Sequence, residues 1–314
     1  MFETEEINYM VMGKKEIKKC RHKAERRWYR RLVILNFIII FGIVSWFVSE
    51  SSNNKKYFNE LGTVATTYVN EDSAGVDKAN KELNKKINEA PDSIGMFFTI
   101  MGLLIFLPLA VSYAYAGYRS MSIRITEKNF PEIYYIAKEY ADRLGMKKVP
   151  TVYMIQGNGI LNAFSAFIPF KQYIELYADL VEVAYREHHD IETLRFLIAH
   201  EMAHIYLGHA KFYYNYSILF SNMIPILSST ASRAREYSCD RIAQKLSGSD
   251  GIDAMMSLTA GIHLYKYIDK DDYIEHAKSV KGFFVWCFNL VSTHPVTSKR
   301  VLALQMQEGS GKLY

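Results

Sequence analysis

The sequence predicts an α+β protein that is mainly helical, with a small antiparallel sheet and two transmembrane helices near its N-terminus. Two long stretches without charge predict the membrane helices. Three short runs typical of strands, at residues 149–155, 161–167 and 173–177, predict the sheet as an antiparallel meander. Segments with helical periodicity account for most of the remaining chain.

Length and composition fit a folded protein with membrane-facing surfaces. The chain has 314 residues, of which 49% are hydrophobic and 14% aromatic, so a disordered or low-complexity protein is excluded. Cys20, Cys239 and Cys287 stand far apart and form no CxxC pair. This pattern argues against a disulfide framework and favours a reducing compartment.

The uncharged stretches that predict the membrane helices cover residues 32–49 and 94–118. At ~1.5 Å per residue the shorter one extends ~27 Å, which is close to the thickness of a bilayer core. Trp28 and Trp46 flank it, as interfacial aromatic residues do. No signal-peptide cleavage site follows it, and Pro108 predicts a kink in the second stretch.

Positive charge predicts the orientation of these helices. Residues 1–31 carry ten Lys or Arg and five Glu, which accounts for the net charge of +5, whereas the loop 50–93 carries six Lys and eight acids. We therefore expect a multi-pass cell-membrane protein with residues 1–31 and 119–314 in the cytoplasm. Because the basic segment adjoins a membrane helix, its expected partner is the lipid bilayer and not nucleic acid.

Helices are predicted in the loop and throughout the globular part. Residues 76–90 predict an amphipathic surface helix within the loop. The apolar segment 212–230 predicts a helical hairpin or a membrane-surface segment. Pro131 and Asp190 mark helix starts. The helices predicted in the globular part cover residues 131–144, 190–208, 231–246, 251–267, 273–290 and 296–307.

The string His200-Glu201-Met202-Ala203-His204 carries the strongest chemical signal. Residues four apart on a helix differ by about 40° around its axis and ~6 Å along it, so both imidazoles can reach one ion. Zinc suits such a site because it accepts neutral imidazole nitrogens. Glu201 lies about 100° from His200, beside the metal, where it can take a proton from a metal-bound water.

A catalytic zinc needs a third protein ligand. His209 lies five residues after His204, about 140° further around a continuous helix, so we expect it to point away from the ion. Glu236 and Asp240 are four apart and share a helix face. One of them can bind the metal while the other accepts a hydrogen bond from a ligating histidine.

These motifs, followed by His294-Pro295 and Arg300, resemble the membrane zinc endopeptidases of the HtpX and CAAX prenyl protease type. The resemblance covers roughly residues 131–303. It implies a zincin fold of the gluzincin class with one Zn²⁺ per chain. The roles that it implies are His200, His204 and Glu236 as ligands and Glu201 as general base.

The resemblance also implies roles for residues around the metal. Asp240 would accept a hydrogen bond from a ligand, and Arg300 would lie close to the site. His294 would hydrogen-bond near the oxyanion. Asn162 and Ala163, on the predicted strand 161–167, would pair with an extended peptide substrate.

The expected activity is hydrolysis of peptide bonds in membrane-associated proteins or peptides by a metal-activated water. Two alternatives stay open: a catalytically silent adaptor that keeps zinc, and a protease dedicated to one peptide precursor. The chain has no room for the many-helix chamber of the prenyl proteases, and Cys239 introduces a thiol close to the zinc site. The oligomeric state is not predicted. The remaining histidines to which we assign no function are His188, His189, His263 and His276.

Overall fold

The computed structural model describes residues 10–70, 76–159, 162–168, 171–187, 190–261, 263–306 and 308–314. His188 and His189 lie outside the described residues, as does the first residue of the predicted strand 161–167. The chain divides into a larger unit, Met1–Val33 with Val111–Tyr314, and a smaller unit, Ile34–Ala110.

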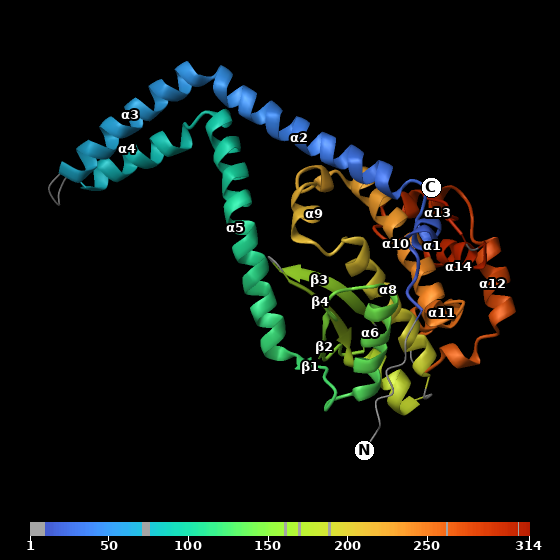
Figure 1. The fold of residues 1–314 in the computed structure, drawn as a ribbon. Coiled ribbons are helices and arrows are strands. Elements are labelled where there is room, and N and C mark those ends of the chain that lie inside the picture. The colour runs from blue at the N-terminus through green and yellow to red at the C-terminus, as the bar shows by residue number, and fades with distance from the viewer. Residues whose placement is uncertain are drawn as a thin grey trace. The chain divides into compact units, whose positions relative to one another are not determined.

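The described part of the smaller unit is helical (Figure 1). It contains most of α2 (Glu25–Ser49), α3 (Ser51–Asn70), α4 (Val76–Asn88) and most of α5 (Asp92–Met121). The Tyr57 hydroxyl of α3 donates to the Lys86 carbonyl of α4 at 3.2 Å, and Lys86 also pairs with Glu60. The surface helix predicted over residues 76–90 is confirmed as α4, whereas α3 was not predicted.

Within the described chain, two helices are long and apolar enough to cross a membrane, and they are α2 and α5. They contain the two predicted stretches, and Pro108 lies inside α5. Large apolar side chains such as Phe41 and Phe106 are exposed on them. Such exposure is costly in water and favourable in lipid.

The larger unit contains one mixed sheet of four strands in the order β1-β2-β4-β3. The strands are β1 (Ile123–Arg124), β2 (Thr151–Ile155), β3 (Ala163–Ile168) and β4 (Lys171–Tyr177). The predicted antiparallel meander is wrong, because β2 and β4 run parallel and only β1–β2 and β3–β4 are antiparallel. Ile174 and Leu176 are fully buried, so β4 takes the interior position and β3 the outer one.

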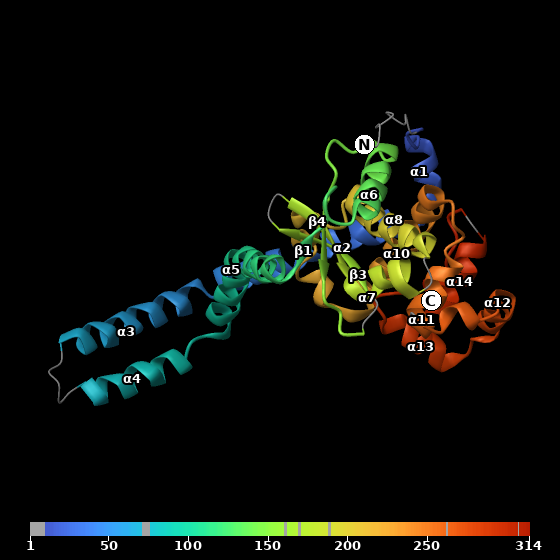
Figure 2. The same ribbon diagram turned by 90° about the horizontal axis from the view of Figure 1, so that it is seen from below.

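Helices pack beside this sheet, and Figure 2 shows two of them, α6 (Pro131–Arg143) and α8 (Ile191–Leu207), near the strands. Both match the predictions closely. The Asp190 side chain accepts a hydrogen bond from the Thr193 backbone at the start of α8, and Gly208 ends that helix at φ 82°. Another core helix, α10 (Pro225–Ser247), packs along α8.

Several predicted helices are interrupted. The prediction over 251–267 is wrong in its middle, where α11 (Ile252–Ala260) ends before the short η3 (Tyr265–Tyr267). The single helix predicted over 273–290 is wrong, because the structure has two helices there, α12 (Lys270–Ser279) and α13 (Phe283–Val291). Gly282, at φ 132°, interrupts the helical backbone between them. Residues 296–307 form α14 (Thr297–Met306).

The segment 212–230 is not a simple helical hairpin. It contains the short helix α9 (Phe212–Tyr216), the 3₁₀ turn η2 (Ser221–Met223) and the first residues of α10. Two further short elements, α7 (Ala178–Glu182) and the π-helical η1 (Val183–Glu187), connect β4 to α8.

The basic N-terminal segment packs against the core of the larger unit. It includes α1 (Lys14–Cys20). Met12, Ile17 and Cys20 are buried in the same cluster as the residues of α6 and α8. The chain therefore enters α2 from a folded segment.

Candidate metal centre

Side chains from α8 and α10 converge at one point. Nε2 of His200 lies 3.2 Å from Nε2 of His204. The two carboxylate oxygens of Glu236 lie 3.3 Å from these nitrogens, Oε2 from His200 and Oε1 from His204. His200 and Glu236 are buried, and His204 is partly buried.

The spacing of these three groups fits a metal ion. Two atoms that bind a tetrahedral zinc at ~2.0–2.1 Å lie ~3.3–3.4 Å from each other. The separation of the two imidazole nitrogens and the separations between each nitrogen and its nearer Glu236 oxygen agree with this value. Two imidazoles and one carboxylate are also a donor set that zinc enzymes use, and it leaves one coordination position for water or substrate.

Asp240 contacts the nitrogen of His200 that faces away from Glu236, and Arg300 binds Asp240. Nδ1 of His200 lies 2.9 Å from Oδ1 of Asp240, and Arg300 donates to both carboxylate oxygens of Asp240. Burial disfavours the charged carboxylate, but Arg300 and His200 outweigh it and lower the pKa of Asp240 to about 2. The ionised carboxylate holds the imidazole so that its Nε2 faces Glu236.

Glu236 is also held in its charged form. Burial opposes ionisation, but the neighbouring His204 and His200 keep the pKa of the Glu236 carboxyl well below its ordinary value. A charged carboxylate is the form that binds a metal.

His294 reaches the same point from the loop between α13 and α14. Its Nε2 lies 3.6 Å from Oε2 of Glu236, and its side chain is 66% exposed. A cavity of about 590 Å³ lies beside it, with Phe288 and Val296 in its lining. Glu201 follows His200 on α8 and is buried.

Asn162 and Ala163 lie at the start of the outer strand β3, which packs on α8. The Tyr177 N–H donates to the Asn162 carbonyl at 3.0 Å, so the Asn162 carbonyl faces β4. Backbone groups alternate between the two edges of a strand. The N–H and C=O of Ala163 therefore point away from β4, toward the outer edge of the sheet.

A comparison with protein families decides the identity of this domain. The family model described as Peptidase family M48 matches residues 127–217 and 211–308, which together exceed half of the chain. The chain belongs to peptidase family M48. The matched regions contain the His200–His204 motif and Glu236, and membership supports a metallopeptidase activity. A search of curated proteins finds no match.

His209 is not part of the group formed by His200, His204 and Glu236, as expected, but the helical angle is not the reason. In the M48 domain, α8 ends at Leu207 and Gly208 adopts a left-handed backbone conformation. His209 therefore lies outside the helix, and the angle expected for a continuous helix does not apply to it. Nδ1 of His209 lies 3.2 Å from Nδ1 of His204. Burial lowers the pKa of His209 to about 4, so its ring is neutral at neutral pH.

Cys239 and Glu25 also contact the His209 ring. The Cys239 sulfur lies 3.7 Å from Nδ1 of His209, and burial raises the pKa of the thiol well above its ordinary value. Oε1 of Glu25 lies 3.0 Å from Nε2 of His209. Sequence reasoning missed Glu25, because no local pattern links it to a motif 184 residues away.

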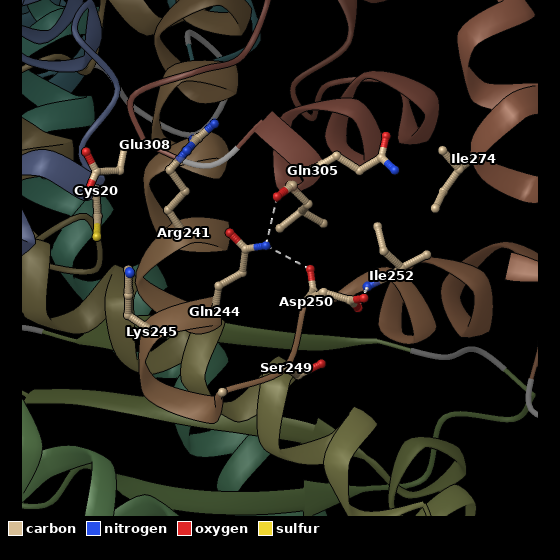
Figure 3. A pocket seen from close by; sticks show the side chains of 12 residues that line it. Cys20, Arg241, Gln244, Lys245, Ser249, Asp250, Ile252, Ile274, Gln305 and Glu308 are labelled. Carbon is tan, nitrogen blue, oxygen red and sulfur yellow. Dashed lines mark hydrogen bonds between the residues drawn. The ribbon is translucent and has the colours of Figure 1, made fainter. Parts of the chain in front are cut away.

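A separate cavity of about 420 Å³ lies at the C-terminal turns of α10 (Figure 3). Gln244 crosses it and donates to the backbone oxygens of Asp250 and Leu304. Cys20, Arg241 and Lys245 also line it. None of the predicted site residues of the M48 domain belongs to its lining.

Proposed function

We propose that this M48 member is a membrane-anchored, zinc-dependent endopeptidase of the HtpX and CAAX prenyl protease type. Its substrates would be membrane-associated proteins or peptides. The observation that carries the proposal is the convergence of His200, His204 and Glu236, whose facing nitrogen and oxygen atoms are 3.2 to 3.3 Å apart.

His200, His204 and Glu236 would hold one zinc ion. Bound there, zinc lowers the pKa of a water to about 7 and polarises the scissile carbonyl. Glu201 would accept the proton of the attacking water and deliver it to the leaving amine. Asp240 and Arg300 keep His200 in the tautomer whose Nε2 is free to bind.

Substrate binding in this proposal uses two further regions. An extended peptide would pair with the outward N–H and C=O of Ala163, as an added strand at the sheet edge. His294 would donate a hydrogen bond to the oxyanion. Its position next to Glu236 and its exposure both suit that role.

The two apolar helices would span the membrane, and the positive-inside rule supports a cytoplasmic position for the M48 domain. A membrane position restricts the enzyme to substrates at or near the bilayer. The proposal therefore names protein or peptide substrates and the lipid bilayer as partners, and it names no nucleic acid.

Glu201→Gln tests the mechanism in the full chain purified in detergent. We expect this variant to bind zinc like the wild type while casein cleavage falls by about 10²–10⁴-fold. Glu192→Gln is the matched control, because Glu192 is exposed on the same helix. A chelator should stop wild-type cleavage and added zinc should restore it.

The outcomes separate the alternatives. Unchanged turnover in Glu201→Gln refutes the base assignment. A wild type that binds zinc but cleaves nothing is the silent adaptor. Comparing new protein termini in cells with wild type or Glu201→Gln distinguishes a dedicated maturation protease, which yields one cleaved precursor, from an enzyme with many substrates.

A further inference from the structure

We propose that His209 and Glu25 are positioning residues for the metal ligand His204, which makes the start of α2 part of the metal centre. The inference rests on the proposed zinc function. It concerns the side of the His204 ring that faces away from Glu236.

Three side chains form a continuous series of contacts there. Nδ1 of His204 lies 3.2 Å from Nδ1 of His209, and Nε2 of His209 lies 3.0 Å from Oε1 of Glu25. His209 is 5% exposed and Glu25 is 3% exposed. Polar groups buried to this extent need their hydrogen bonds, because unmade ones are costly.

The contacts in this series favour one arrangement of hydrogens. An ionised carboxylate only accepts, so Nε2 of His209 carries a hydrogen and donates to Glu25. With its hydrogen on Nε2, the His209 ring can accept at Nδ1 the hydrogen of His204 Nδ1, which lies 3.2 Å away. His204 is left with a bare Nε2, which is the atom that faces Glu236 and His200.

Glu25 is itself held firmly. The Ser238 hydroxyl donates to Oε2 of Glu25 at 2.5 Å, and Nε of Arg21 donates to the same oxygen at 3.1 Å. Ser238 also accepts a hydrogen bond from the His22 backbone at 2.9 Å. Because Ser238 stands two residues after Glu236 on α10, one helix fixes both a metal ligand and the end of the His204 series.

The two histidine ligands therefore have matching support from different parts of the chain. His200 relies on Asp240, which is also on α10. His204 relies on Glu25, which is the first residue of α2. Zinc affinity therefore depends on the contacts between the start of α2 and the M48 domain.

Zinc affinity of the full chain in detergent tests the proposal. It is measured by competition with a chromophoric chelator, with the visible spectrum of the Co²⁺ form as a second readout. We expect Glu25→Gln and His209→Gln each to weaken zinc binding about 10–100-fold and to alter the Co²⁺ spectrum. The double variant should bind no more weakly than the worse single variant, because both changes break one series.

Glu16→Gln is the matched control, because Glu16 lies in the same N-terminal segment and is exposed; it should bind zinc like the wild type. Thermal unfolding shows whether each variant is folded. If Glu25→Gln does not fold, His209→Gln decides alone, since the hydrogen bond from the Asn215 side-chain amide to the His209 backbone carbonyl is kept.

A wild type that binds no zinc overturns the proposed function and this inference together. A wild type that binds zinc, with both variants within about threefold of its affinity and an unchanged Co²⁺ spectrum, overturns the inference alone.

Discussion

Arg300 donates two hydrogen bonds to Asp240, from Nε to Oδ2 at 2.9 Å and from Nη2 to Oδ1 at 2.6 Å. The two residues come from α14 and α10, and Asp240 lies 2.9 Å from Nδ1 of His200. A planar guanidinium thus fixes the carboxylate that fixes the imidazole. The orientation of His200 depends on a residue that touches no ligand atom.

Arg300→Lys is expected to weaken zinc binding about tenfold although it keeps the positive charge, because an ammonium group cannot donate the two parallel bonds. Arg300→Ala leaves a buried carboxylate without its cation and should lower the free energy of unfolding by about 3–5 kcal/mol. Chelator competition and chemical unfolding measure the two effects.

The control for this pair is Arg186→Lys, an exposed arginine whose ion pair with Glu182 is long at 4.0 Å. Exposed pairs of this kind contribute about 0–1 kcal/mol, so little change is expected. Wild-type zinc affinity in Arg300→Lys would show that the paired hydrogen bonds do not orient His200.

Local signals made α8 and its ligands predictable. The apolar pattern, the Asp190 cap and Gly208 all lie within the helix or next to it, and the predicted and observed bounds nearly coincide. The four-residue spacing of Glu236 and Asp240 needs only a helix to place both on the His200 side. These parts of the site follow from short stretches of sequence.

Non-local packing decided the rest. The strand order depends on which strand is most buried. The buried strand β4 therefore pairs with β2, and β3 lies at the edge of the sheet. The position of His209 depends on a single left-handed residue after the helix. Glu25 contacts it across 184 residues, and no periodicity in the sequence reports such a contact.

A buried acid on the sheet gives a prediction about pH. Glu175 on β4 is 1% exposed, and neither carboxylate oxygen has a hydrogen-bond partner among the described residues. Its cross-strand neighbours are Phe164 and Tyr153. Burial raises the pKa of Glu175 to about 7, because an apolar aromatic environment disfavours the charged form.

The folded state therefore binds a proton at Glu175 more tightly than the unfolded state. Between the ordinary pKa of 4.5 and the folded pKa of about 7, stability falls as pH rises, and above that range the loss is about 3 kcal/mol. Glu175→Gln should remove this loss. Chemical unfolding of both proteins at about pH 5 and about pH 8 measures the difference.

Glu275→Gln, at an exposed position on α12, is the control and should keep the wild-type pH profile. The wild type and Glu175→Gln should differ in stability most at the higher pH. A Glu175→Gln profile parallel to that of the wild type would mean that Glu175 is ionised in the folded protein.

The outer strand β3 gives a prediction about substrate binding. Ala163 is opposite Leu176, and its N–H and C=O point outward because the neighbouring Asn162 carbonyl bonds to β4. Ala163→Pro removes the outward N–H and leaves the β3–β4 hydrogen bonds in place. The loss of one backbone hydrogen bond to substrate should lower kcat/KM about tenfold.

Steady-state cleavage of a peptide by Ala163→Pro and by Ala163→Ser measures this effect, because serine keeps the N–H at nearly the same size. Thermal unfolding of the proline variant checks that β3 still pairs with β4. If the substrate binds along this edge, kcat/KM is lower for Ala163→Pro than for Ala163→Ser. Equal values, with both proteins folded, would mean that the peptide does not bind along this edge.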